Sequence, residues 1–159
     1  MLIKVLGIGS PFAEDQAGWF VAKALTLQWL QEGQILDFLH IECSDRPGLR
    51  LIELMQGSTQ VFLVDAVYSG QKVGTIHRLQ ADDIQVANPL FSTHHMGIVE
   101  ALQLGKALDC LPEEVIFYGI EINSIEVDAE ISDSVRRAID QVVLRINNEL
   151  LQLLTAFIF

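Results

Sequence analysis

The sequence of 159 residues is poor in basic residues, in cysteine and in long apolar runs. Ten Lys and Arg stand against 21 Asp and Glu, a formal net charge of −11. A surface this acidic repels phosphate groups, so we expect neither nucleic acid nor membrane as a partner. Cys43 and Cys110 form no Cys-x-x-Cys pair and no disulfide framework, which is typical of a reducing cytosol. No apolar run is long enough to span a membrane, and none has the pattern of a signal peptide. The sequence therefore predicts a soluble cytoplasmic protein.

Familiar nucleotide and metal motifs are also missing. The opening stretch "GIGSPFAEDQAGW" (residues 7–19) resembles a glycine-rich turn before a helix, but Phe12 occupies the place of the third glycine of the dinucleotide fingerprint. Neither a P-loop nor a His-Glu-x-x-His motif occurs. Two acids in this stretch, Glu14 and Asp15, would repel a phosphate. They either complement the dipole of the following helix, or one of them faces the strand ends as a metal ligand or general base.

Half of the residues are apolar, which predicts one domain (residues 1–159) with a substantial core. Short apolar runs alternate with helical patterns, which favours a three-layer α/β/α fold around a mostly parallel, about five-stranded sheet with one weak strand antiparallel at its edge. The helix after the first strand places apolar side chains at helical spacing, and the apolar C-terminus is interpreted as a packed or self-associating end. The expected strands are residues 2–9, 35–43, 59–67, 74–80 and 114–122. The expected helices are residues 17–30, 47–57, 93–108 and 131–154, the last capped by Ser132. The apolar stripe of the first helix is expected to consist of Trp19, Phe20, Ala24, Leu27 and Leu30.

In sheets of this type the site lies outside the carboxyl ends of the strands, here segments 10–15, 43–45, 65–69 and from 121 onward. Asp65 closes the apolar run "VFLVDAV", and a carboxylate there needs a partner because an unpaired buried charge is costly. In "STHHMG", His94 and His95 diverge by about 100° on a helix, so one faces the cleft, or both are surface residues at a cap. Two carboxylates and one imidazole suit zinc or nickel. His40 and His77 are interpreted as ordinary strand residues.

A different chemistry uses Cys43 as the nucleophile of a hydrolase, with His94 or His95 as base and Asp65 as its orienting partner. Nothing around Cys43 resembles a nucleophile elbow, and Ser10 is not within a Gly-x-Ser-x-Gly motif. The residues alone leave this alternative beside the metal site.

Four blocks of the sequence, in order from residue 3 to about residue 146, resemble the nickel-iron hydrogenase maturation proteases. These are small endopeptidases that trim the C-terminal extension from the hydrogenase large subunit. The blocks are "GIGSPFAEDQAGW", "VFLVDAVYSGQKVGTIHRL", "STHHMGIVEALQLGKAL" and "VIFYGIEINSIEVDAEISDSVRRAIDQVV". Ser10 stands where the family usually has Asn, Ala13 where Gly is frequent, and Glu14 replaces the first Asp of its acidic pair.

The resemblance implies that Asp15, Asp65 and His94 bind a nickel ion and form the catalytic site, with Glu14 as a solvated neighbour of Asp15. The nickel is carried by the partner, the large-subunit precursor, and zinc or cadmium would substitute for it in vitro. The implied activity is cleavage of the precursor's C-terminal extension, with the aspartic or metal-dependent type, the cleavage site and the oligomeric state left open. Two other classes stay open: a nickel-recognising binding or chaperone module without cleavage, and a nucleotide hydrolase or ligand-binding relative suggested only by the layered fold.

Overall fold

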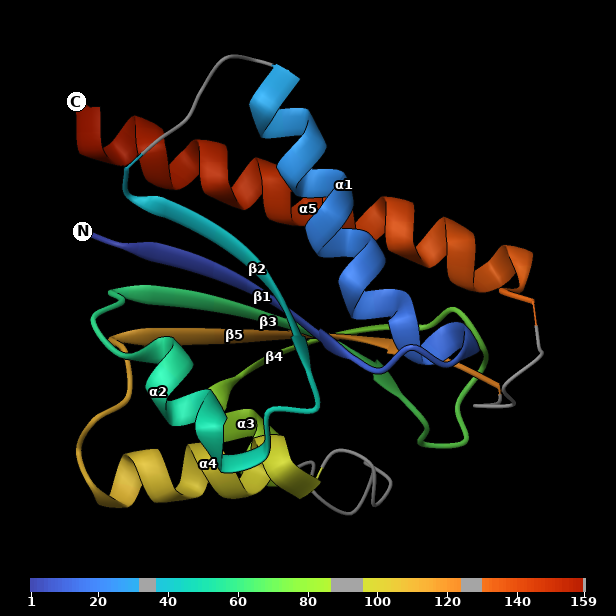
Figure 1. Ribbon diagram of the computed structural model, residues 1–159, viewed down its shortest axis with the longest axis horizontal. Coiled ribbons are helices and arrows are strands. Elements are labelled where there is room, and N and C mark those ends of the chain that lie inside the picture. The colour runs from blue at the N-terminus through green and yellow to red at the C-terminus, as the bar shows by residue number, and fades with distance from the viewer. Residues whose placement is uncertain (32–36, 87–95, 124–129, 159) are drawn as a thin grey trace.

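The computed structural model describes residues 1–31, 37–86, 96–123 and 130–158 (Figure 1). Within these ranges the chain alternates strands and helices as the sequence predicts. The strands are β1 (Ile3–Gly9), β2 (Leu39–Asp45), β3 (Gln60–Val67), β4 (Ile76–Gln80) and β5 (Glu114–Glu121). The helices are α1 (Ala17–Gln31), α2 (Leu51–Met55), α3 (Ala81–Val86), α4 (Met96–Ala107) and α5 (Asp133–Ile158), with the short 3-10 helices η1 (Ala13–Gln16) and η2 (Gly48–Arg50).

The strands form one sheet in the order β2-β1-β3-β5-β4. The first four of these are parallel, and β4 pairs antiparallel with β5 at the edge, which confirms the predicted sheet. β3 lies at the centre and is buried at every position, because an apolar strand on both faces can be covered only between two helical layers. In the described ranges no helix is both long enough and apolar enough to cross a membrane.

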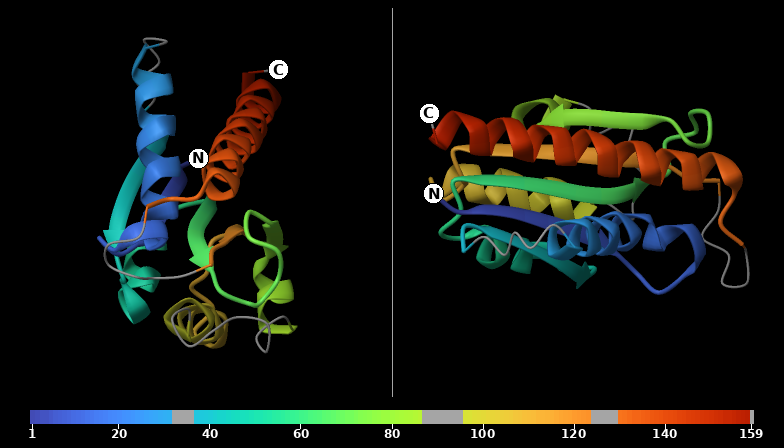
Figure 2. Two further views of the ribbon diagram at one scale, coloured as in Figure 1. Left: turned by 90° about the vertical axis from the view of Figure 1, so that its right-hand side faces the viewer. Right: turned by 90° about the horizontal axis from the view of Figure 1, so that it is seen from above.

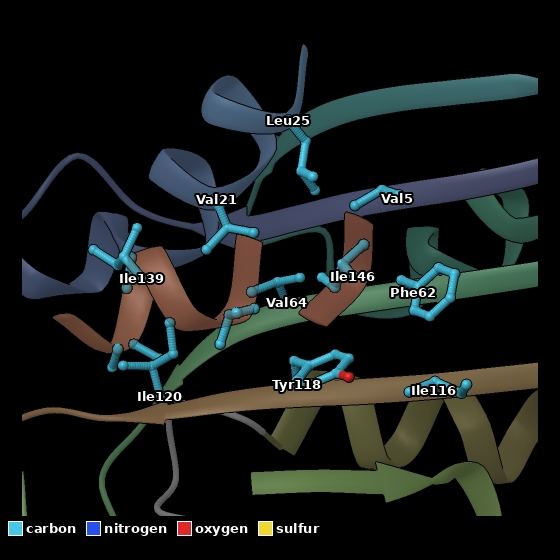
Figure 3. Close-up of a cluster of buried hydrophobic side chains, with 14 of the residues drawn as sticks. Val5, Val21, Leu25, Phe62, Val64, Ile116, Tyr118, Ile120, Ile139 and Ile146 are labelled. Atoms are coloured by element: carbon cyan, nitrogen blue, oxygen red, sulfur yellow. The ribbon is translucent and has the colours of Figure 1, made fainter. Parts of the chain in front are cut away.

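Helices cover both faces of the sheet, so the predicted three-layer arrangement is confirmed (Figures 1 and 2). α1 and α5 pack on one face, where their apolar side chains meet those of β1, β3 and β5 (Figure 3). α2, α3 and α4 pack on the other face around a second apolar cluster. Burial on both faces leaves the strand ends as the place for polar chemistry.

Several details differ from the expectations. The second strand covers 39–45 rather than 35–43, and the helix expected at 47–57 is η2 followed by the short α2. α3 was not predicted.

The Ser132 cap is confirmed, because the Val135 amide donates to Ser132 Oγ at 3.4 Å. The predicted start of the helix at 93 lies outside the described residues.

The apolar stripe predicted for α1 is wrong at Leu27 and Leu30, although Phe20 does pack against the core. Leu27 and Leu30 are 61% and 54% exposed. The residues that face the sheet instead are Ala17, Gly18, Val21, Ala22, Leu25 and Trp29. The small residues Ala17, Gly18 and Ala22 occupy the first part of this face, where the helix approaches the sheet most closely.

The close approach is made at Gly18. A Cβ at this position would lie 2.3 Å from both the Ile8 and the Val64 carbonyl oxygens. Gly7 is the matching position on β1, since its Cβ would lie 2.3 Å from the Gly18 carbonyl oxygen. The glycines at the start of the chain therefore let the backbone approach another part of the protein itself.

We predict that Gly18→Ala lowers the free energy of unfolding by roughly 3 kcal/mol, because two backbone oxygens cannot move away from the new methyl group. Urea denaturation measures the change. Gly105→Ala is the matched control, since its Cβ would meet only the flexible end of Leu111 and helix propensity favours Ala. Its effect stays within about 1 kcal/mol. Equal effects of the two substitutions would contradict the packing argument.

A polar cluster joins α5 to β4 and β5. Arg78 makes two bonds to Glu149, at 3.0 and 2.9 Å, and the Tyr118 hydroxyl donates to Glu149 Oε1. Burial and the bond to Glu149 raise the pKa of Tyr118 to about 12. Burial opposes ionisation of Glu149, but the bonds from Arg78 and Tyr118 outweigh it and lower its pKa.

The raised pKa of Tyr118 makes its contribution to stability dependent on pH. The protonated hydroxyl is favoured by folding, so the contribution is complete below pH 10 and is lost as the pH rises toward about 12. We therefore expect the difference in unfolding free energy between the wild type and Tyr118→Phe to narrow over this range. Urea denaturation at a series of pH values measures it, and a constant difference would contradict the role of the hydroxyl proton.

Candidate functional site

The carboxyl ends of the four parallel strands meet at one edge of the sheet, where the sequence predicts the site. The segments after β1 and β2 are joined there, because the Arg46 amide donates to the Gly9 carbonyl at 3.0 Å. The Trp19 indole N–H also donates to the Ser44 carbonyl at 2.9 Å. η1 packs against β3 at the same edge. The four predicted segments are thus brought together.

Asp15 lies in η1 and is half-buried. Its Oδ2 accepts a hydrogen bond from the Ser10 hydroxyl, and its carbonyl accepts the Ser10 amide at 3.3 Å. Ser10, itself buried, therefore orients the carboxylate at the place where the family usually has Asn. The Arg46 guanidinium lies close enough for the Asp15 charge to add to that of Asp45 in raising the pKa of Arg46.

Asp65 lies two residues before the end of β3 and is only 4% exposed. Its Oδ1 accepts the Ala66 amide at 2.7 Å, which stabilises the ionised form. The register places Asp65 beside Gly119 of β5, where an added Cβ would lie 2.4 Å from Val67 and 2.9 Å from Phe117. Asp65 is thus a buried carboxylate at the strand ends, as the sequence predicts.

The prediction that Glu14 is solvated is wrong. Glu14 is 4% exposed, and its carboxylate accepts the Asn123 amide at 3.1 Å and the Ser132 amide at 3.0 Å. These amides belong to the segment after β5 and to the cap of α5. Glu14 therefore faces inward and fixes η1 to the start of α5, whose amides favour a negative charge. Two adjacent acids have different roles because neighbours on a 3-10 helix point in different directions.

We expect Glu14→Ala to lower the free energy of unfolding by roughly 2–4 kcal/mol, because two amides lose a charged acceptor. Chemical denaturation measures the loss. Glu100→Ala on the exposed face of α4 is the control and stays within about 0.5 kcal/mol. A Glu14 variant as stable as the control would show that these two bonds contribute nothing.

Glu121 is a residue that sequence reasoning did not single out within its segment. It is fully buried at the end of β5, where its carboxylate accepts hydrogen bonds from the Ser69 amide and hydroxyl and contacts His77 Nε2 at 3.1 Å. His77, interpreted as an ordinary strand residue, therefore has a carboxylate partner. The signal in the sequence was an acid at the end of an apolar strand, the same pattern that identified Asp65.

The alternative with Cys43 as nucleophile gains no support. Cys43 lies within β2, which continues to Asp45, and its thiol contacts the Trp19 carbonyl at 3.8 Å. Partial desolvation raises the pKa of the thiol, although the Lys23 charge opposes the shift. A nucleophilic cysteine needs the opposite shift, toward the thiolate.

The predicted metal ligands divide into two groups. Asp15 in η1 and Asp65 in β3 lie on two elements that contact each other, and they supply oxygen donors of the kind that a divalent ion accepts. His94, with His95, lies outside the described residues. Within the ranges that are described, no three His, Cys, Asp or Glu side chains converge on one metal position. A metal site at this edge would therefore need a donor beyond the two carboxylates.

A family model described as "HycI: Hydrogenase maturation protease" matches residues 47–149. This range contains Asp65 and His94 and begins after Asp15. The hydrogenase expression/formation protein HupD of Thiocapsa roseopersicina is 27% identical over 131 residues, which make up 79% of this chain and 56% of HupD. The chain thus spans a little over half the length of that relative.

Solved structures show the same fold over nearly the whole chain. The hydrogenase maturating endopeptidase HybD of E. coli has a TM-score of 0.79 at 21% identity, covering 96% of this chain and 93% of HybD. The [NiFe] hydrogenase maturation protease HybD of Thermococcus kodakarensis has a TM-score of 0.72 at 25% identity, covering 94% and 99%. The first likeness concerns the fold, since the identity is low.

Proposed function

The chain belongs to the hydrogenase maturation protease family, and we propose that it is the endopeptidase that removes the C-terminal extension of a nickel-loaded hydrogenase large-subunit precursor. The observation that carries the proposal is the pair of carboxylates at one end of the sheet, Asp15 in η1 after β1 and Asp65 near the end of the neighbouring strand β3. The family match and the shared fold support the choice of substrate.

In this proposal the nickel ion arrives with the substrate. Asp15, Asp65 and His94 bind it and so hold the precursor in position. Oxygen and nitrogen donors suit nickel, and zinc or cadmium would occupy the same ligands in vitro. A precursor that lacks nickel offers these residues nothing to bind, so it is not processed.

Cleavage requires a water molecule, a base and an amine leaving group. The water oxygen bonds to the scissile carbonyl carbon while a carboxylate takes the water proton, and the amide nitrogen leaves as the C–N bond breaks and takes up a proton. Asp15 is our choice for the base, because it is half-buried and held by Ser10 beside the proposed ion position. Asp65 is buried and bonded to the backbone, which suits binding better than proton transfer.

We predict that Asp15→Asn, Asp65→Asn and His94→Ala each lower precursor processing by about 100-fold or more, since each removes a charge or donor from the substrate's ion. Gel analysis of purified nickel-loaded precursor measures processing, and circular dichroism checks folding. Asp45→Asn is the matched control at the same edge, because Asp45 is exposed and bonded only to Arg46 in the described contacts. Normal processing by all three folded variants would show that the assigned site is wrong.

The wild-type protein separates the remaining alternatives when it is incubated with loaded and nickel-free precursor. Cleavage of the loaded form alone supports the proposal. Binding of the loaded form without cleavage indicates a nickel-recognising module of the same fold. Tight binding of a nucleotide in place of the precursor would indicate the third class.

A further inference from the structure

Glu121 is a buried acid that the proposed reaction does not use. Its side chain is 0% exposed, yet its carboxylate is satisfied by three groups from two other segments. Oε2 accepts the Ser69 amide at 3.3 Å, and Oε1 accepts the Ser69 hydroxyl and lies 3.1 Å from His77 Nε2. Burying a carboxylate is costly unless hydrogen bonds satisfy it, and the bonds that satisfy Glu121 also join β5 to Ser69 and His77.

The backbone of Glu121 holds the other end of the same loop. Its carbonyl accepts the Gly74 amide at 2.9 Å, and its amide donates to the Thr75 carbonyl at 2.9 Å. One residue therefore fixes both ends of the segment between β3 and β4, residues 68–75. This loop leaves the sheet at the end where η1 and the start of α5 lie (Figure 1).

The pairing of β5 with β3 places Glu121 close to Asp65. Glu121 pairs with Val67 of β3, two residues beyond Asp65, so both acids lie on the same face of the sheet. Tyr68 follows Val67 directly and is 49% exposed, although Ser69 next to it is bonded to the buried carboxylate. Tyrosine is among the residue types enriched at binding hot spots, and Tyr68 is exposed at the end of the sheet where the proposed ligands Asp15 and Asp65 lie.

We infer that Tyr68 contacts the precursor segment next to the scissile bond, and that Glu121 is a positioning residue that holds the 68–75 loop, on which Tyr68 lies three residues beyond Asp65 at the same end of the sheet. The inference rests on the proposed function for its substrate. The ligand proposed for Tyr68 is an extended peptide, whose apolar groups can pack against the tyrosine ring.

Two substitutions at one position separate positioning from chemistry. Glutamine has the shape of Glu121, and its carbonyl oxygen can accept the Ser69 amide while its NH2 group donates to Ser69 Oγ and to an unprotonated His77 Nε2. Glu121→Gln therefore keeps the loop in place without the charge. Glu121→Ala removes every side-chain bond to the loop.

The experiment measures KM and kcat for nickel-loaded precursor, with unfolding followed in urea for each variant. We expect Glu121→Ala and Tyr68→Ala each to raise KM about tenfold, with kcat within about twofold. The double variant raises KM less than the product of the two, because both remove the same contact. Glu121→Gln stays within about threefold of the wild-type KM. Glu149→Ala, which breaks a comparable carboxylate cluster, lowers stability and leaves KM unchanged.

Three results overturn the inference. They are an unchanged KM in folded Glu121→Ala or Tyr68→Ala, equal losses in Glu121→Gln and Glu121→Ala, and a double variant whose effects multiply. The proposed function fails separately, through a wild-type protein that does not cleave. In that case the Kd for binding of the precursor to each variant is measured in place of KM. A wild-type protein that neither cleaves nor binds the precursor overturns both the proposed function and this inference.

Discussion

The contact on which the structure depends is the approach of α1 to β1 and β3 at Gly18. The Gly18 backbone lies against the Ile8 and Val64 carbonyls, at a distance that no other residue type allows. This contact fixes both the rotation of α1 and its height above the sheet. Because η1 directly precedes α1, the same contact determines where Asp15 and Glu14 lie. The glycine-rich start of the chain thus serves packing, and the two acids of η1 precede the close contact directly.

Two buried acids then connect the loops at the carboxyl edge. Glu14 joins η1 to the segment after β5 and to the cap of α5, and Glu121 joins β5 to the 68–75 loop. Their partners are amides, a hydroxyl and one imidazole. Loops normally vary in position more than strands do, so a site built on loops needs such connections to keep its geometry.

The sheet could be predicted from the sequence because its signal is local. The apolar run of β3 and the alternation of strands with helices suffice to indicate the layers, and Asp65 follows from its place at the end of that run. The buried face of α1 could not be predicted, since it depends on contacts that Gly18 makes with β1 and β3. The same holds for Glu14, whose partners lie 109 and 118 residues away. His94 stays a prediction, since it lies outside the described residues.

The hydrogen-bond partners of the buried acids help to determine the charge at the strand ends. Glu14 accepts hydrogen bonds from two amides, and Glu121 accepts them from the Ser69 amide and hydroxyl and contacts His77. Asp15 and Asp65 are likewise bonded to a hydroxyl and an amide. Structural and proposed functional acids therefore lie together at this end of the sheet with Arg46 close to Asp15, and the excess of acids gives this end a negative field. Such a field attracts a cation that is carried by another protein, and the acidity of the whole chain extends the same preference to its surface.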